Sequence, residues 1–317
     1  MKVSNLYFNI LPNKVSLKPN DSKMTHAQNM TTLGDFPKSY CPNISFGSIS
    51  CNDIDFEYDF FKVADDIINN HLDKMELTKD LSDSQQIQFR KNLFSCDKPT
   101  LLNFMFDAKP SILLSGKYPF FENNDKYDFV SRNLRSPLKN DKVYLSSNLF
   151  ILNKELSKQV IDENKELYSK RMGMPDTVST DEIYKKLTGK DSPLKKQKGY
   201  DDLIGVTLGY SPKNAVLFQL EQEIPDKYEA RKRPIYYANM LDKIFNSEQS
   251  PYKDFSNEFK TDIQSSINYV KKNGFSNTNL NAIGYSYIQI APDYKHTEKL
   301  LQNANTVYSK AKRLTTL

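Results

Sequence analysis

The sequence contains few of the residues from which common catalytic and cofactor sites are built. Its ten glycines include no two that are separated by a single residue, and neither Gly-Lys pair is followed by serine or threonine. These absences exclude the glycine-rich dinucleotide loop and the P-loop, the two standard phosphate cradles. The three histidines form no H-x-x-x-H pair, and the three cysteines have no zinc-ligand spacing. We therefore expect neither a cofactor nor a metal site.

Long apolar runs are also missing. No stretch approaches the ~20 apolar residues that a membrane helix needs, and polar residues interrupt the N-terminal stretch before it forms a signal peptide. The three scattered cysteines are too few for a disulfide framework and are typical of reduced thiols. The sequence thus predicts a soluble protein of the cytoplasm without a membrane span.

Aromatic residues are abundant, with 19 tyrosines and 19 phenylalanines but no tryptophan. Each ring can bury roughly 150–250 Å², so these residues suffice for a sizeable core. Residues 1–52 are instead rich in Asn, Ser, Thr, Pro and Lys and show no periodicity. We predict a disordered or strap-like tail over 1–52 and a folded body over 53–317. If the body has two lobes, the composition places their boundary near 140–150 or 190–199.

Helical spacing of apolar residues dominates the body. Ser179 and Glu182 match a capping box at the start of one helix, and Gly173 with Pro175 ends the helix before it. Ile87 is expected to face inward from another helix. The helices predicted in this way cover residues 56–76, 82–95, 153–172, 179–187, 234–246, 256–272 and 294–314.

Strand patterns are shorter. Residues from 142 alternate over one short stretch, and residues 283–290 alternate more clearly, which makes them the best strand candidate. Residues 100–115 are apolar and divided by Pro110, which fits two buried strands or one strand and a turn. Residues 190–198 are polar and basic, typical of an exposed loop. The sum is an α+β fold, predominantly helical with a small sheet.

The most sharply punctuated segment is LGYSPKNAVLFQLE, residues 208–221. Gly209 suits the left-handed position that follows a helix, Ser211 suits an N-cap, and Pro212 suits a first helical turn. The spacing predicts two helices, about 200–208 and 212–222, that meet at a tight corner. Such a corner is either a buried structural element or an anion site at the start of the second helix.

The corner resembles a segment of uncharacterised bacterial protein families, in which Gly-x-x-x-Gly-Tyr or Leu-Gly-Tyr-Pro opens a second apolar helix. The resemblance covers residues 200–222 of 317, and Ser211 stands where proline is common. It implies a helix-turn-helix-like corner and a bacterial-type protein, but no activity. The matching residues are Gly205, Leu208, Gly209, Tyr210, Ser211 and Asn214.

The preferred functional hypothesis rests on the missing catalytic motifs, the long polar tail and the mild basicity. The basic clusters are either solvated faces or parts of an anion-binding surface. Arg231 and Arg233 suit bidentate contacts to phosphate or carboxylate, and the helix 294–314 adds further cations. If these residues converge, they would bind an anionic partner. The net charge of +5 is mild and disfavours a dedicated nucleic-acid binder. We expect a non-catalytic interaction protein whose partner is a protein or an anionic small molecule.

The alternative hypothesis is an enzyme that acts on a small anionic or phosphorylated substrate. It assigns Asp202 as the base and His296 as the acid, and it requires all of its candidates in one pocket. A structural role competes with it, because Asp201 and Asp202 also suit the first turn of a helix. The proposed ligand-binding residues are Tyr210, Ser211, Asn214, Arg231 and Arg233. The geometry of the corner does not require Tyr210 or Asn214, so their presence there stays unexplained by the corner itself.

Overall fold

The computed structural model describes residues 53–92, 98–115, 121, 124–137, 143–196, 198–276, 280, 283–285 and 289–315. The predicted tail over 1–52 lies outside these residues. The chain divides into two compact units, Met1–Phe56 and Glu57–Leu317. The lobe boundary suggested within the body stays a prediction.

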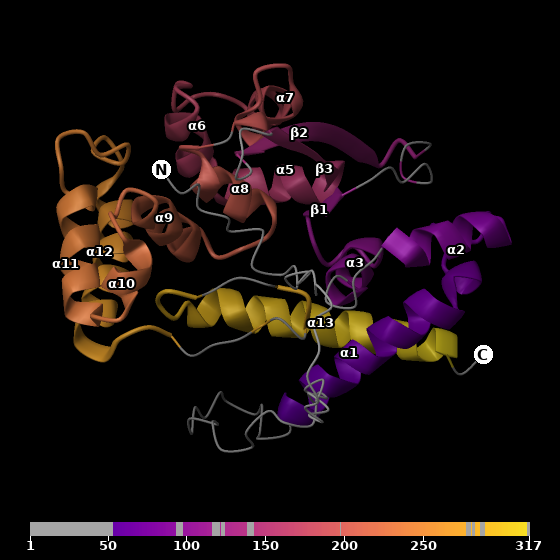
Figure 1. Ribbon diagram of the computed structural model, residues 1–317. Coiled ribbons are helices and arrows are strands. Elements are labelled where there is room, and N and C mark those ends of the chain that lie inside the picture. Colours follow the sequence, from indigo (N-terminus) through magenta and orange to yellow (C-terminus); the bar gives the residue numbers. More distant parts are fainter. Residues whose placement is uncertain are drawn as a thin grey trace, which may run out of the picture. The chain divides into compact units, whose positions relative to one another are not determined.

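Helices make up most of the described chain and accompany one small sheet (Figure 1), which confirms the predicted α+β class. The helices are α1 (Asp53–Asn70), α2 (Asp83–Asn92), α3 (Lys98–Met105), α5 (Lys154–Glu163), α6 (Lys165–Arg171), α7 (Thr180–Thr188), α8 (Asp201–Thr207), α9 (Pro212–Glu221), α10 (Lys227–Arg231), α11 (Pro234–Phe245), α12 (Asn257–Asn273) and α13 (Tyr294–Thr315), with 3₁₀ turns at Leu72–Lys74 and Pro193–Lys195. The strands are β1 (Ser111–Ser115), β2 (Tyr127–Pro137) and β3 (Val143–Asn153).

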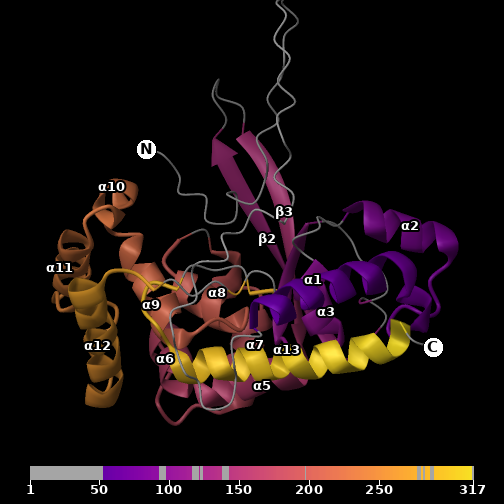
Figure 2. The same cartoon turned by 90° about the horizontal axis from the view of Figure 1, so that it is seen from below.

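The sheet is antiparallel, with strand order β1-β3-β2 and two long strands that run side by side (Figure 2). The sequence predicted only the start of β3 and missed β2. A buried arginine hides the alternation of β2, because Arg132 occupies an inward position and its Nη2 donates to the carbonyl of Lys196 at 3.0 Å. From the sequence alone, a polar residue at a buried position is assigned to the solvent-facing side of a strand.

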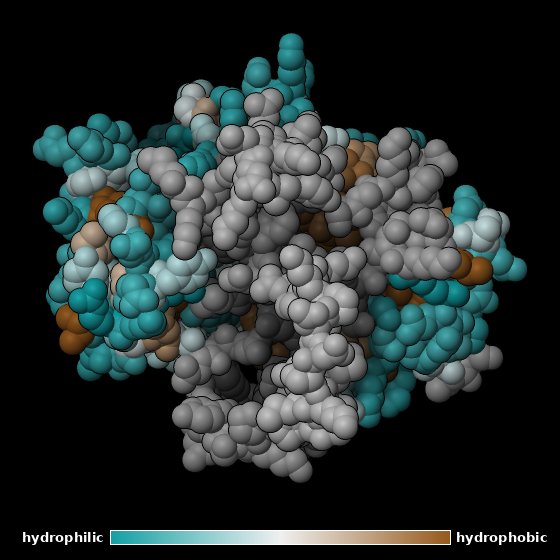
Figure 3. All heavy atoms as spheres, in the orientation of Figure 1, coloured by the Kyte–Doolittle hydropathy of each residue, from teal (hydrophilic) through white to brown (hydrophobic). Residues whose placement is uncertain are grey.

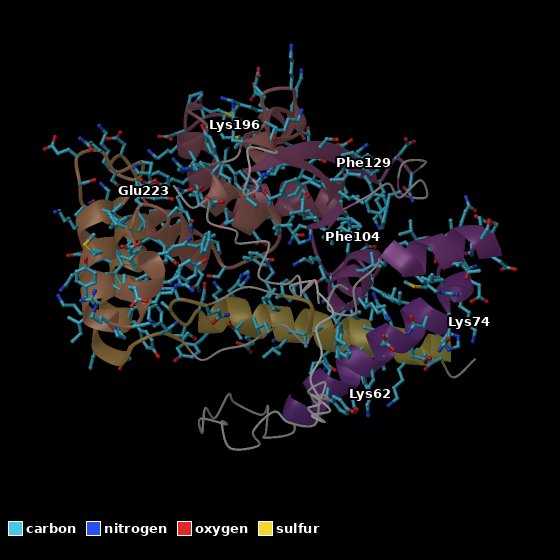
Figure 4. The ribbon with its side chains drawn as sticks, viewed as in Figure 1. Lys62, Lys74, Phe104, Phe129, Lys196 and Glu223 are labelled. Carbon is cyan, nitrogen blue, oxygen red and sulfur yellow. The ribbon has the colours of Figure 1, made fainter. Side chains whose placement is uncertain are left out.

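The segment 100–115 is a helix followed by a strand, which corrects the expectation of two strands or a strand and a turn. Pro99 lies in the first turn of α3, where its missing N–H costs nothing. Phe104 of α3 (Figure 4) packs on Tyr127 and Phe121, with ring centroids 5.3 and 5.5 Å apart. Pro110 precedes β1 rather than dividing two strands.

The segment 283–290 was the best strand candidate, and among its described residues this prediction is wrong. Tyr285 forms only an isolated bridge with Leu280. Side chains of α3 take the carbonyls that a strand partner would use: Asn103 Nδ2 donates to Ile283 O at 2.6 Å, and Thr100 Oγ1 donates to Gly284 O at 2.9 Å. The chain at Ile283 and Gly284 is therefore held against α3 and not against a strand.

Most predicted helices are confirmed, together with their end signals. Ser179 and Glu182 form the capping box at 3.2 and 2.9 Å, and the stretch from Asn153 is a pair of helices, α5 and α6. Two details are wrong. Ile87 is exposed on α2, and the loop 190–198 contains the 3₁₀ turn Pro193–Lys195, in which Leu194 is fully buried.

Candidate functional site

The corner between α8 and α9 has the predicted construction. Gly209 is left-handed, with φ +83°, and a Cβ atom there would lie 3.0 Å from Pro110 Cδ. The side chain of Ser211 caps α9 by accepting a bond from the amide of Asn214 at 3.4 Å, and Pro212 occupies the first turn. All these punctuation residues therefore have a structural role.

A carboxylate from the chain itself occupies the predicted anion position. Ser211 Oγ donates to Asp293 Oδ2 at 2.6 Å, and the backbone amide of His296 donates to Asp293 Oδ1 at 3.2 Å. Asp293 thus serves the starts of α9 and α13 together, where helix dipoles favour a negative charge. The carboxylate of Asp293 supplies the negative charge that a bound ligand would have supplied. The geometry therefore favours the structural interpretation of the corner.

Asn214 clamps the chain that leads to α13. Its Oδ1 accepts bonds from the amides of Ile290 at 2.7 Å and Ala291 at 3.0 Å, and its Nδ2 donates to Ala291 O at 2.8 Å. The residue is buried, and its side-chain amide is satisfied by these backbone atoms together with Ser211 Oγ, which accepts from Nδ2 at 3.4 Å. The bonds to Ile290 and Ala291 join residues that are 76 and 77 positions apart in the sequence. Tertiary contacts therefore explain why an asparagine stands at the corner.

His296 ties the first turn of α13 to the corner. Its Nε2 lies 3.2 Å from the carbonyl oxygen of Gly209, to which a neutral ring donates. Burial lowers the pKa of His296, and the carboxylate of Asp293 opposes part of this effect. The imidazole therefore tends to stay neutral as a hydrogen-bond donor.

The ring of Tyr210 lies near the buried amine of Lys109, a residue that no sequence pattern had singled out. Lys109 Nζ lies 5.0 Å from the ring centroid of Tyr210 and 4.1 Å from that of Tyr285. The lysine is 1% exposed, and its Nζ has no hydrogen-bond partner among the described residues. Its only sequence signal is a lysine placed directly before Pro110 and an apolar strand. Tyr210 is thus explained as part of an aromatic cover for this amine.

Asp202, the predicted base, is buried and surrounded by donors. Arg171 Nε donates to its Oδ2 at 2.6 Å, Tyr252 OH donates to the same oxygen at 2.7 Å, and the amide of Leu203 donates to Oδ1 at 2.9 Å. Burial raises the pKa of Tyr252 well above its ordinary value, which keeps its hydroxyl a donor. Asp202 is therefore a structural acceptor between α6, α8 and the residues after α11.

Its neighbour Asp201 is the more perturbed carboxylate. Burial raises the pKa of Asp201 to about 6, and Arg132 and Lys227 oppose the shift. Its backbone amide donates to Gln219 Oε1 at 2.8 Å. Both aspartates lie in the first turn of α8, as the structural interpretation expected.

The two candidate arginines have different environments. Arg231 Nη2 donates to Glu221 Oε2 at 2.6 Å, and Tyr237 OH donates to the same oxygen at 3.1 Å. Glu221 is buried, so Arg231 neutralises an internal charge. Arg233 is exposed, with its guanidinium 4.7 Å from the ring centroid of Tyr236. Only Arg233 of this pair is directed to the surface.

The structure brings four of the seven candidates together and separates the others. Tyr210, Ser211, Asn214 and His296 meet at the corner, whereas the side chain of Asp202 bonds to Arg171 and Tyr252, and that of Arg231 to Glu221. Asp202 and His296, the proposed base and acid, share no hydrogen-bond partner among the described residues. Of the seven candidates, only these four at the corner lie close to one another.

Two shallow depressions open to solvent elsewhere on the described surface. One lies between α11 and α12 and is lined by Phe245, Asn246, Lys260, Thr261, Gln264, Ser265 and Asn268. The other lies on the exposed face of α13 and is lined by Asn305, Thr306, Ser309, Lys310 and Arg313. Neither includes any of the seven candidates. The second is the one with two cations.

Within the described ranges, no group of three His, Cys, Asp or Glu side chains is arranged to hold a metal ion. None of the helices in that part of the chain is long and apolar enough to cross a membrane. Comparison of the chain with family models, curated proteins and solved structures gives no match. The resemblance of the corner to bacterial families stays a prediction.

Proposed function

We propose that this chain is a non-catalytic interaction protein that binds an acidic segment of a partner protein along the exposed face of α13. One observation carries the proposal. From residue 299 to residue 315 the sequence has no aspartate or glutamate, and it has four cations, Lys299, Lys310, Lys312 and Arg313. Such a segment is a one-sign electrostatic surface within a chain whose net charge is only +5.

The helix displays these cations because its other face is buried. Leu300, Ala304, Val307 and Ala311 point into the protein at helical spacing. The opposite face presents Thr306, Ser309, Lys310 and Arg313, which line a single open depression. Hydroxyl and amide groups beside two cations suit carboxylates, because they supply hydrogen bonds as well as charge.

Neighbouring elements support the same surface. Lys74 lies at the C-terminal end of α13, where its Nζ donates to the carbonyl of Leu314 at 3.1 Å (Figure 4). Lys299 pairs with Glu163 at 2.9 Å, and the other three cations of this segment lie in the last turns of α13, at positions 310, 312 and 313. Cations at a helix C-terminus also complement the helix dipole, but this local effect does not explain hydroxyl groups on the same face.

The surface fits an acidic protein segment better than a nucleic acid. Non-specific single-strand binding depends on exposed aromatic rings that stack on bases. On this half of α13 the aromatic residue is Tyr308, and it is half-buried with its hydroxyl 3.2 Å from Lys312 Nζ. A flat helical face with two cations one turn apart matches the carboxylate spacing of an acidic helix.

The enzyme alternative receives less support, because its candidates are engaged by internal partners. Asp202 accepts four hydrogen bonds, Ser211 donates to Asp293, and Arg231 neutralises Glu221. We also place the protein in the cytoplasm, since three scattered cysteines suit a reducing compartment. The bacterial-type origin rests on the resemblance of the corner alone.

Fluorescence anisotropy with labelled poly-L-glutamate tests the proposal, with single-stranded DNA of equal charge as the second probe. The full chain is expected to bind poly-L-glutamate, with affinity that falls as salt rises. The double variant K310E/R313E should bind about tenfold more weakly or worse, since like charges then face the probe. The matched control is K271E/K272E, which changes the same charge at the end of α12, where both lysines are exposed.

Equal losses in the two double variants would show a net-charge effect and contradict a specific surface on α13. Absence of poly-L-glutamate binding by the full chain would also contradict the proposal. Tight binding of DNA with weak binding of poly-L-glutamate would replace it with nucleic-acid binding. Circular dichroism and thermal unfolding of both variants check that the fold is retained.

A further inference from the structure

Lys109 lies where three distant segments of the chain meet. The turn before β1, the α8–α9 corner and the connection to α13 are joined there by hydrogen bonds. Ser111 Oγ donates to Thr207 O at 2.7 Å, and Tyr285 OH donates to Ala108 O at 3.2 Å. The third link is His296 Nε2 to Gly209 O at 3.2 Å. We name this region the Lys109 junction.

The amine at the centre of the junction is not compensated. No carboxylate contacts Lys109 Nζ, and it has no hydrogen-bond partner within the described part of the chain. Asp107, two residues earlier, is engaged by Lys126 and by Asn153 Nδ2 at 3.0 Å. Asp293, on the connection to α13, is engaged by Ser211 and the amide of His296. Both nearby carboxylates therefore have other partners.

Among the described residues, the titratable groups that face Lys109 do not neutralise a positive charge on its amine. The phenols of Tyr210 and Tyr285 present ring faces at 5.0 and 4.1 Å, which attract an ammonium but replace only part of its hydration. His296 is a second base on the α13 side, and a positive charge on Lys109 or Lys299 lowers its pKa further. Two groups that become cations on protonation thus face each other across the corner.

Burial lowers the pKa of Lys109 to about 7. An ordinary surface lysine stays charged throughout the physiological range, whereas this amine changes its charge near neutral pH. A desolvated ammonium without a partner is costly, and local opening of the surrounding chain relieves the cost by admitting water. The segments that can open are those held by the three links of the junction.

We propose that Lys109 is a protonation-controlled lock, which holds the connection to α13 against the α8–α9 corner when the amine is neutral and releases it when the amine is charged. The released segments are 207–214 and 289–296. The inference is independent of acidic-partner binding, because it concerns how α13 is attached and not what its exposed face binds.

The sign of the effect follows from the two protonation states. The open or unfolded chain has a lysine pKa of 10.5, and the closed junction has one of about 7. Between these values the open state binds more protons, so closure becomes more favourable as pH rises. Below pH 7 both states are protonated, and the cost of closure is present in full. His296 adds an effect of the same sign, but at lower pH, because its pKa lies below the ordinary value.

Hydrogen exchange measured by mass spectrometry on the full chain tests the lock at pH 6.5 and pH 8.5, after correction for intrinsic exchange rates. Peptides from 207–214 and 289–296 should be protected roughly tenfold more strongly at pH 8.5 in the wild type. Lys109→Met keeps the length of the side chain and removes the titrating group, so this pH dependence should disappear.

Lys98→Met is the matched control. Lys98 is also a buried lysine, but it is paired with Asp65 and donates to Asn69 Oδ1 at 3.0 Å. The pH dependence at 207–214 and 289–296 should persist in this variant. The lock is overturned if protection in the wild type does not change with pH, or if Lys109→Met retains the change.

A measurement on the wild type covers the case in which Lys109→Met does not fold. Carbon-13 spectra of the chain labelled at lysine Cε follow each amine through its titration. One amine with a midpoint near pH 7 supports the lock, and the absence of any lysine that titrates below pH 9 overturns it.

Discussion

Two buried charged groups, Asp202 and Lys109, have opposite surroundings. Asp202 receives donors from Arg171, Tyr252 and the backbone, and is fully buried. Lys109 is buried to the same degree, yet it has ring faces in place of a counter-charge. Burial of a charged group alone therefore does not define a function. A compensated charge fixes packing, whereas an uncompensated one makes the packing depend on pH.

The largest expected effect comes from breaking the compensated group. Asp202→Ala leaves the buried guanidinium of Arg171 without its carboxylate, so the free energy of unfolding should fall by about 3–5 kcal/mol. Urea unfolding at pH 7 measures the loss. Lys79→Ala is the control, because it removes an exposed, solvent-screened ion pair with Glu76 and should leave the free energy of unfolding nearly unchanged. Equal losses would show that burial does not distinguish the two pairs.

A smaller effect is expected at the corner. Asn214→Ala leaves two amides and one carbonyl of Ile290 and Ala291 without partners, which should reduce the free energy of unfolding by about 1–3 kcal/mol. Hydrogen exchange should quicken in 289–296 before it does elsewhere. Asn246→Ala is the control, since Asn246 makes its hydrogen bonds at the surface. A loss spread evenly over the chain would contradict the role of a local clamp.

The third expected effect is a gain in stability, and it tests the difference between the two buried groups most directly. Lys109→Met removes a buried amine without a hydrogen-bond partner among the described residues, so the free energy of unfolding below pH 7 should rise by at least about 1 kcal/mol. The gain should shrink as pH rises from 7 towards 10.5, because the wild-type amine becomes neutral in the folded state first. Urea midpoints at pH 6.5 and 9.5 measure it, and a gain that is independent of pH would indicate better packing only.

Local signals in the sequence predicted the helices and their ends well, because caps and left-handed glycines act within a few residues. The capping box at Ser179 and the N-cap at Ser211 are examples. The strand predicted over 283–290 failed because alternation is also a local signal. It indicates that one face is buried, but not which element covers that face. Ile283 and Gly284 are covered by Asn103 and Thr100 of α3, about 180 positions away.

The candidate site was predicted in part. Tyr210 and Asn214 were singled out because the corner did not require them, and both make contacts far along the chain. Their partners were not predictable, because nothing in the sequence indicates that Tyr210 meets Lys109 or that Asn214 meets the backbone of Ile290 and Ala291. Asp202 and Arg231 were chosen for their chemistry, and the structure pairs each with an internal opposite charge.

Composition and neighbours within a few positions were enough to predict the α+β class and the signals that begin and end the helices, and they place four cations and no carboxylate over residues 299–315. The tertiary structure alone decided which charges are compensated. Asp202 and Lys109 are equally polar in the sequence, but the electrostatic cost of burial depends on groups that folding brings from other segments. That is why a lysine before a proline, unremarked in the sequence, is the residue on which the pH dependence of this protein is expected to rest.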